Sequence, residues 1–391
     1  MLTGLIFLLI LSVLVLIHEA GHFFVAKKLG IKVEEFGFGL PLTKALFSVK
    51  RGETTYSFYP ALIGGFVKLY GEDEAGAGRI KVKEHKEVSK DKDRAFFSRP
   101  IWQRVAVIVA GVVMNTVLAV AIYYSFLGIT NFRTEIPLLG DHKFFAVNQQ
   151  NKSEIIISDV AKDSPAEKAK VKPLSKILSV NGQKVATMDF FIEFIKKNKG
   201  QEVILELQDL KTSDKQTIKL TPRVNPPKNQ GALGVSFFPI KTAVLTYETQ
   251  AQKLFSGFTH PLNLMSYNFD VMGKLIATSI KDKTAEPISQ GVSGPVGIYS
   301  VVGEIINIPN MRERVLQLLN LAGLLSISLA FFNVLPIPGL DGGRLFFIII
   351  EAVTRKKLNP KFEAYANAIG MAVLIGLIIL VTFKDLFQIL K

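Results

Sequence analysis

Hydrophobic residues gather in four long runs that polar sequence separates. The runs cover residues 1–26, 101–129, 315–335 and 364–383. An α-helix needs about 20 consecutive apolar residues to cross the hydrocarbon core of a bilayer. The pattern therefore predicts four transmembrane helices.

The first run has the character of a retained helix. It contains Glu19 but no lysine or arginine before Lys27. A secretory signal peptide begins with positive charge and ends at a small-residue cleavage site, and this run has neither feature. A further apolar stretch, residues 340–353, is too short to span a membrane. We expect it to continue the turn after the third helix at the membrane edge.

Two regions outside the predicted helices carry patterns of soluble structure. Residues 32–70 alternate polar and apolar positions between glycines, which indicates short strands and hairpins. Residues 140–240 mix strand and helix patterns, so we expect an α+β domain there. Its predicted strands are residues 155–157, 203–207 and 217–220, and its predicted helix is residues 189–197.

The fold class that follows is a polytopic α-helical membrane protein with membrane-associated β-hairpins and an inserted α+β domain. Within the segment 241–310, residues 255–280 space their apolar positions either as an amphipathic helix on the membrane surface or as a packed interdomain helix. We expect an N-terminal membrane part (1–139, with the β-hairpin region 27–100), the inserted domain (140–240), a connecting segment (241–310) and a C-terminal membrane part (311–391).

Lysine and arginine in short loops predict the orientation, because such loops stay cytoplasmic when they are positively charged. Lys27 and Lys28 follow the first helix, and residues 355–361 between the third and fourth helices are also basic. Both places should therefore be cytoplasmic. Both termini and the inserted domain should then be extracytoplasmic, with residues 18–22 toward the cytoplasmic side.

Composition narrows the chemistry. The 391 residues contain 49% hydrophobic and 20% charged residues, a mixture that excludes disordered and fibrous chains. There is no cysteine, which excludes disulfides, cysteine-ligated zinc, iron–sulfur clusters and thiol catalysis. The net charge is +14, but acidic residues interleave with the basic ones. We interpret this as a solvated surface and expect no nucleic-acid partner.

The strongest chemical signal is the sequence His18-Glu19-Ala20-Gly21-His22 inside the first predicted helix. Helical i, i+4 spacing puts both imidazoles on one face, where they can bind one zinc ion. Glu19 can then act as a general base toward water. Ionisable groups inside a membrane span are costly and usually functional, which disfavours ordinary core histidines.

A catalytic zinc takes three protein ligands and leaves one position open. The other histidines, His85, His142 and His260, lie away from the predicted membrane helices. The remaining candidate is Asp341 in the segment 333–343, where two prolines interrupt the helix. Irregular backbone at membrane depth is tolerated where it is buried or lines a wet cavity. The alternative is an ordinary helix-terminating turn.

These two motifs, in this order, resemble the site-2 protease family of intramembrane zinc metalloproteases. Within that family the chain is most similar to the bacterial regulator-of-sigma-E protease group. The resemblance covers nearly the whole chain in the family's order. Further matching segments are Gly37-Phe38-Gly39, Gly64-Gly65-Phe66-Val67-Lys68, Ala110-Gly111 with Asn115, and Gly294-Pro295-Val296-Gly297-Ile298.

The resemblance implies roles for single residues. His18, His22 and Asp341 would hold one Zn²⁺ per chain, with Glu19 as the catalytic base. Asn333 would hold substrate backbone near the metal. The remaining expected substrate-binding positions are Gly64, Gly65, Phe66 and Asn115, and for Asn115 an interhelical hydrogen bond is an equal alternative.

The glycine-rich segment 64–68 suggests how a helical substrate is opened. A peptide bond in a helix hides its carbonyl in a hydrogen bond, whereas a peptide added to a strand edge is extended. We hypothesise that this segment pairs with an unwound substrate. A proline at Gly65 or Phe66 should then reduce cleavage without releasing zinc.

The inserted domain is similar to a single PDZ domain. The resemblance rests on residues 163–169 and 177–185, although the chain has Ala169-Lys170-Val171 where the family usually has Ala-Gly-Leu. Such a domain would act as a gate or size filter for membrane stubs that an upstream site-1 protease has trimmed.

Taken together, the resemblance implies regulated intramembrane proteolysis in the bacterial cytoplasmic (inner) membrane. The substrates would be single-span proteins, such as anti-sigma factors or remnant signal peptides, cut within the lipid bilayer. Two other classes stay open at this point. One is a membrane-anchored PDZ scaffold with a vestigial zinc site. The other is a metal-ion transporter that uses His18, His22 and Asp341 as a transit site.

Overall fold

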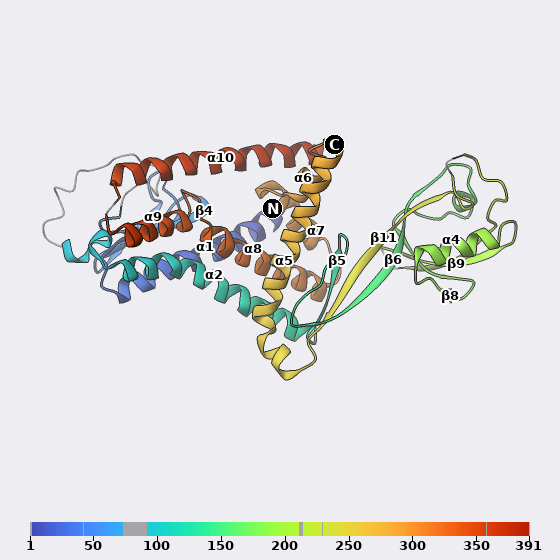
Figure 1. The fold of residues 1–391 in the computed structure, drawn as a ribbon, viewed down its shortest axis with the longest axis horizontal. Coiled ribbons are helices and arrows are strands. Elements are labelled where there is room, and N and C mark those ends of the chain that lie inside the picture. The colour runs from blue at the N-terminus through green and yellow to red at the C-terminus, as the bar shows by residue number, and fades with distance from the viewer. Residues whose placement is uncertain are drawn as a thin grey trace. The chain divides into compact units, whose positions relative to one another are not determined.

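The chain divides into two compact units in the computed structural model (Figure 1). The membrane unit comprises Met1–Ile129 and Leu254–Lys391, and the inserted unit comprises Thr130–Lys253. The inserted unit is longer at both ends than the predicted segment 140–240. The predicted four-part division of the chain stays a prediction. The structure describes residues 2–41, 43–72, 92–210, 214–228, 230–356 and 358–390.

Within the described residues, four helices of the membrane unit are long and apolar enough to cross a membrane. They confirm the four predicted helices, and the last extends beyond both of its predicted ends. Their surfaces expose large apolar side chains, which lipid can cover. They are α1 (Leu2–Lys28), α2 (Ile101–Ile129), α8 (Met311–Val334) and α10 (Pro360–Leu390).

The predicted continuation of the turn after the third helix is wrong. Residues Asp341–Thr354 form a separate helix, α9, which puts Asp341 in a first helical turn and not on irregular backbone. α8 ends at Val334, and Pro336 and Pro338 lack the N–H groups that would continue it. The two prolines therefore end α8 and separate it from α9.

The predicted segment 255–280 lies within α5 (Gln250–Asp282). Its small and polar residues Ser256, Gly257 and Asn263 are buried, while Phe255 and Phe258 are exposed. A helix on the surface of a water-soluble protein buries its apolar side chains and exposes its polar ones, so α5 shows the reverse pattern. The remaining helices of the unit are α6 (Glu286–Gly291), α7 (Pro295–Ile306) and the 3₁₀ turns η3 (Lys92–Arg94) and η4 (Phe96–Ser98).

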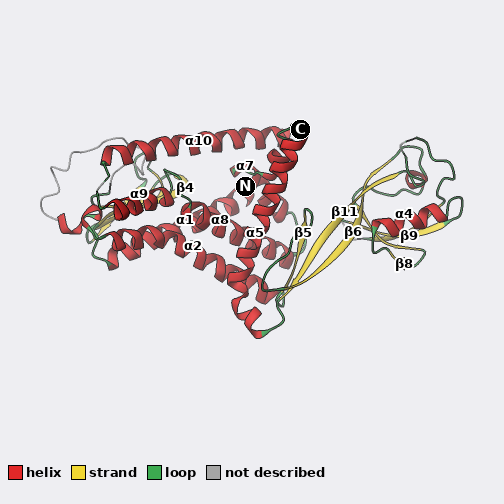
Figure 2. Ribbon diagram, in the orientation of Figure 1, coloured by secondary structure: helices red, strands yellow, loops and turns green. Residues whose placement is uncertain are grey.

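A four-stranded sheet in the membrane unit confirms the strands predicted for residues 32–70 (Figure 2). The strand order is β2-β3-β1-β4, with β1 and β3 parallel and the other pairs antiparallel. β4 is consequently an edge strand, and it packs against α1. Residues 73–91 of the predicted region 27–100 lie outside the described residues. The strands are β1 (Val33–Leu40), β2 (Phe47–Arg51), β3 (Thr54–Phe58) and β4 (Ala61–Leu69).

The inserted unit is an α+β structure around one sheet with the order β10-β9-β7-β6-β11-β5, and β8 pairs with β7. Its core is mostly aliphatic, with Ile155, Ile157, Leu205 and Leu207 among its members, and it includes the buried Phe191. All three predicted strands and the predicted helix are present. The elements are β5 (Arg133–Leu138), β6 (Asn148–Val160), α3 (Pro165–Lys168), β7 (Ser175–Val180), β8 (Gln183–Lys184), α4 (Met188–Lys197), β9 (Val203–Asp209), β10 (Lys215–Leu220) and β11 (Val235–Thr246).

Candidate metal centre

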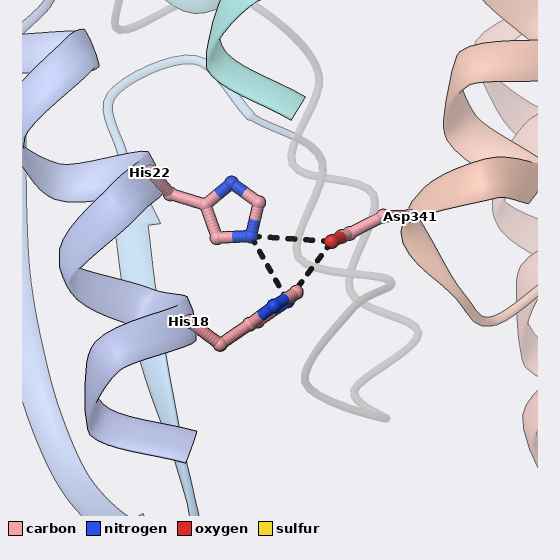
Figure 3. Close-up of side chains that lie close together, drawn as sticks. All are labelled: His18, His22 and Asp341. Carbon is pink, nitrogen blue, oxygen red and sulfur yellow. Dashed lines mark hydrogen bonds and ion pairs between the residues drawn. The ribbon is translucent and has the colours of Figure 1, made fainter. Parts of the chain in front are cut away.

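Three side chains from two helices converge on one point (Figure 3). His18 and His22 project from α1, and Asp341 projects from the first turn of α9. The two Nε2 atoms lie 3.2 Å apart, and Oδ2 of Asp341 lies 3.0 Å from Nε2 of His18 and 3.2 Å from Nε2 of His22. Zinc ligands at ~2.0–2.1 Å in a tetrahedron stand roughly 3.3 Å from one another. The donor set and its spacing therefore fit one zinc ion.

The ring orientation of His22 suits metal binding. Its Nδ1 donates a hydrogen bond to the carbonyl oxygen of Val107 on α2, at 2.8 Å. In a neutral imidazole that leaves the lone pair on Nε2, the atom that faces the other two donors. The backbone of α2 thus selects the tautomer that could bind zinc.

His18, like His22, has a polar neighbour on α2. Nδ2 of the fully buried Asn115 lies 3.3 Å from Nδ1 of His18. When Nε2 of His18 binds a metal, Nδ1 carries the proton, and its neighbour must accept. The Oδ1 atom of Asn115 is buried without a hydrogen-bond partner among the described residues, so rotation of the amide supplies this acceptor.

Close approach of α2 to α1 depends on two glycines. A Cβ at Gly111 would lie 2.5 Å from Nε2 of His22 and 2.7 Å from Cε1 of His18. A Cβ at Gly21 would lie 2.4 Å from the carbonyl oxygen of Ala110. Real side chains never approach so closely, so only glycine fits at either position. This steric role of Gly111 was not predicted from the sequence.

Two further glycines fix the backbone around Asp341. Added Cβ atoms at Gly342 and Gly343 would lie 2.1 Å from the carbonyl oxygen of Leu335 and 2.4 Å from that of Ile337. The first turn of α9 therefore packs directly on the backbone that precedes it. Oδ2 of Asp341 is buried and accepts no hydrogen bond within the described part of the chain. A buried carboxylate oxygen in this state is suited to a cation.

Glu19 lies beside the three donor atoms and outside that group of ligands. It is half-buried, and β4 passes over it. A Cβ at Gly65 would lie 3.3 Å from Cγ of Glu19. An acidic side chain is thus held next to a candidate metal and next to the backbone of an edge strand.

A cavity of about 680 Å³ joins these groups. Four of the five predicted substrate-binding residues, Gly65, Phe66, Asn115 and Asn333, line it together with Glu19 and the three candidate metal ligands. Gly64 is not part of the lining, and its backbone has φ +118°, a conformation that favours glycine. The structure therefore brings nearly all of the predicted residues to one cavity.

Sequence reasoning missed several polar residues that also line the cavity. Arg344 forms an ion pair with Glu72, and it follows Asp341 by three residues, a spacing that puts both on one helix face. Asn367 of α10 lines the cavity as well. A buried amide in a membrane-length helix was a visible signal, because polar groups there are costly.

The other histidines contribute no donor to the group found among the described residues. His142 lies in the inserted unit, and His85 lies outside the described residues. The prediction that all of them lie away from the membrane helices is wrong for His260, whose ring stacks on Phe126 of α2 at 6.2 Å. Burial lowers the pKa of His260 to about 4 and keeps the ring neutral.

Comparisons with known proteins agree with this geometry. Residues 6–377 match the description "Peptidase family M50". A protein of Clostridium perfringens that carries the name of a zinc metalloprotease is 32% identical over 97% of both chains. The "Regulator of sigma-W protease RasP" of Bacillus subtilis is 26% identical over 98% of both chains.

One solved structure, a PDZ domain of an SdrC-like protein from Listeria monocytogenes, matches at 17% identity. It covers 21% of this chain and 85% of its own, with a TM-score of 0.19. A TM-score at that level does not establish a common fold.

Proposed function

Because the chain belongs to peptidase family M50 and is an integral membrane zinc metalloprotease, we propose that it hydrolyses peptide bonds in or near the membrane spans of single-span proteins. The observation that carries this proposal is the group of three donor atoms, 3.0–3.2 Å apart, beside Glu19 on a helix of membrane length. Catalytic groups at that depth favour substrates that also lie in the membrane.

In the proposed reaction His18, His22 and Asp341 hold the zinc ion. When bound, the ion supplies Lewis-acid chemistry, which polarises the scissile carbonyl and lowers the pKa of a water molecule to about 7. Glu19 accepts a proton from the attacking water and delivers it to the nitrogen of the leaving amine. The oxygen of that water forms the new C–O bond as the C–N bond breaks.

The position of β4 at the edge of its sheet supports the substrate mode that the sequence suggested. Among the described residues, the only strand that pairs with β4 is β1, and Gly65 brings the backbone of β4 next to Glu19. An extended peptide added to that edge would run beside the metal ligands with its carbonyl groups exposed. Asn333, which lines the same cavity, would hold the substrate backbone there.

Charges at the helix ends support an orientation for the membrane unit. Lys27 and Lys28 end α1, and Arg355, Lys356 and Lys361 lie between the body of α9 and that of α10. We take these ends as cytoplasmic, because basic short loops stay on that side. Both termini and the inserted unit would then be extracytoplasmic. The metal ligands, near the end of α1, would lie toward the cytoplasmic side of a bacterial inner membrane.

Natural substrates of the anti-sigma-factor or remnant-signal-peptide type belong to this proposal. One relative is named for regulation of a sigma factor. The inserted unit, which we take as PDZ-like, would admit only membrane stubs that an upstream site-1 protease has already trimmed. Deletion of residues 140–240 should then widen the range of substrates that are cleaved.

The test is cleavage of a tagged single-span reporter by purified wild type and Glu19→Gln, with zinc quantified in both. Since Glu19 is not one of the three donors, the variant should keep its zinc and lose cleavage. Cleavage by Glu19→Gln at the wild-type rate would contradict the assignment of the base. Zinc flux into sealed vesicles without cleavage would favour the transporter.

A further inference from the structure

The turn that precedes Asp341 has little internal hydrogen bonding. Pro336 and Pro338 have no N–H group, and Gly339 has φ +95°, in the region that favours glycine. In the described chain, the bonds within this turn are two: the N–H of Ile337 donates to the carbonyl of Leu335 at 2.7 Å, and the N–H of Leu340 donates to that of Ile337 at 3.1 Å. Leu340 caps α9 without a side-chain bond. A turn of this kind needs outside contacts to hold one conformation.

α10 supplies such contacts. The N–H of Gly339 donates to Oδ1 of Asn367 at 3.2 Å, and Asn367 is only 5% exposed. One helical turn later, a Cβ at Gly370 would lie 2.0 Å from the carbonyl oxygen of Pro338. A Cβ at Gly339 would likewise lie 2.9 Å from the backbone nitrogen of Met371. The turn thus rests directly on the backbone of α10.

The rest of α10 shows that this contact is specific. Every residue from Ile375 to Leu380 is exposed, all round the helix. The next polar contacts of α10 in the described chain lie near its C-terminal end. There Lys384 donates to the carbonyls of Ser289 and Val292, and the buried Asp385 accepts the N–H groups of Gly294 and Gly297, each at 2.8 Å. The exposed stretch thus separates two points of polar contact on α10, and the first of these, at Asn367 and Gly370, is where the helix meets the turn that carries Asp341.

We propose that Asn367 and Gly370 are positioning residues for the zinc ligand Asp341. Asn367 fixes the amide of Gly339, and Gly370 lets the turn dock on α10, so that Oδ2 meets the two histidine nitrogens. This inference rests on the proposed function and extends it to a helix that contributes no ligand. Metal sites require their ligands within about 0.5 Å of the working geometry, so a shifted turn should release the ion.

Two glycines of α10 provide a matched pair of variants. A Cβ at Gly370 collides with Pro338, whereas a Cβ at Gly376 meets nothing within 4 Å. We expect Gly370→Ala to lower the zinc affinity of the purified full chain by at least about tenfold, since losing a group that orients a ligand costs 10–100-fold. Gly376→Ala should stay within about twofold of wild type, the small change expected for an exposed position.

Asn367 offers a second, independent pair of variants. This pair tests the proposal even if Gly370→Ala fails to fold. Asn367→Leu removes the acceptor and should lower zinc affinity about tenfold. Asn367→Asp keeps an oxygen in the same place, and rescue to within about threefold of wild type is expected because the hydrogen bond to Gly339 persists. If Asn367 served only to fill space, Asn367→Asp and Asn367→Leu would have the same zinc affinity.

Zinc affinity is measured by competition with a chelator in detergent, and kcat and KM are measured on the tagged reporter. Wild-type zinc affinity in both Gly370→Ala and Asn367→Leu would overturn the inference, as would a change confined to KM, which would make Asn367 a substrate contact. A wild type that holds zinc but cleaves no reporter would instead count against the proposed function and leave the positioning result standing on zinc affinity alone.

Discussion

The two sides of the metal centre are held in different ways. The histidine side lies on a single helix, α1, and α2 packs closely against both histidines through Gly111, Asn115 and the carbonyl of Val107. On the carboxylate side, α9 packs on α2 and on the backbone that precedes it, but the turn before Asp341 rests on α10 through only a few contacts, and the middle of α10 is exposed on every side. Helix packing thus fixes the two histidines, whereas the position of Asp341 depends on the contact of one turn with Asn367 and Gly370 of α10. The difference predicts which substitutions remove zinc outright and which merely weaken its binding.

The largest effect should come from the closest contact on the histidine side. Gly111→Ala puts a methyl group within 2.7 Å of both imidazole rings. We expect zinc to be lost and cleavage to fall by at least about 1,000-fold, because misplacement by 1 Å alone can cost 100-fold. Zinc content and reporter cleavage measure this.

The control for that variant lies on the same helix. A Cβ at Gly128 meets no atom within 4 Å, so Gly128→Ala should keep wild-type zinc and activity. Equal activity of the two alanine variants would mean that α2 does not hold the rings as closely as we describe.

The next effect tests the link between the two sides. Arg104 of α2 and Glu351 of α9 form an ion pair at 2.8 Å, and their side chains are 10% and 16% exposed. Glu351→Gln should destabilise the protein by about 3 kcal/mol, since it leaves a buried charge without its partner. Thermal unfolding in detergent measures the loss.

The double variant Arg104→Met with Glu351→Met is the matched comparison. It removes both charges and should recover most of the lost stability, because well-packed apolar residues replace buried ion pairs at little cost. A double variant as unstable as Glu351→Gln would show that the loss does not come from the unpaired charge.

A smaller effect is expected at Asn115. Asn115→Leu removes the acceptor for Nδ1 of His18 and should lower zinc affinity about tenfold, at the lower end for a group that orients a ligand. Packing of α2 holds the ring even without the hydrogen bond, so the site should still form. Asn115→Asp, which keeps an acceptor, should bind zinc more tightly than Asn115→Leu. The reverse order would exclude the tautomer role.

The smallest effect lies away from both sides. The pKa of Glu53 is lowered by hydrogen bonds from Lys27, at the end of α1, and then from Arg94. A lowered pKa stabilises the fold above the unfolded-state pKa, and this gain disappears as the pH falls through the folded-state pKa. Glu53→Gln should cost at most about 1 kcal/mol near pH 7, because the pair is partly exposed.

Melting temperatures of wild type and Glu53→Gln, recorded from pH 7 downward, check this. The two should converge in acid, where Glu53 is protonated in both the folded and the unfolded chain. A difference that grows on acidification would have the wrong sign for a lowered pKa.

Sequence could predict the histidine side because its geometry is local. The spacing of His18 and His22 sets both rings on one face of a helix, whatever the rest of the chain does. Asp341 could be placed near them because two prolines interrupt an apolar stretch. The sequence did not predict that Asp341 lies in a helix, because the start of α9 depends on Gly342 and Gly343 packing on preceding carbonyl groups.

The supporting residues were harder to predict, since their contacts span long stretches of chain. Nothing local to Asn367 says that its amide meets Gly339, which lies 28 residues earlier in the sequence. The same holds for Gly111, whose steric role appears only when α2 lies against both rings. The four-stranded sheet could be predicted in part. Its strands follow from alternation, but the position of β4 at the edge beside Glu19 depends on the strand order.

The most direct test of the central claim is X-ray absorption at the zinc edge of the purified protein, with the metal quantified. We predict one zinc per chain, with two imidazole nitrogens and oxygen atoms as the remaining ligands at about 2.0–2.1 Å. Asp341→Ala should reduce the zinc content, and His22→Ala should remove it. A spectrum without two imidazoles, or zinc that persists unchanged in both variants, would contradict the assignment of His18, His22 and Asp341 as the metal centre.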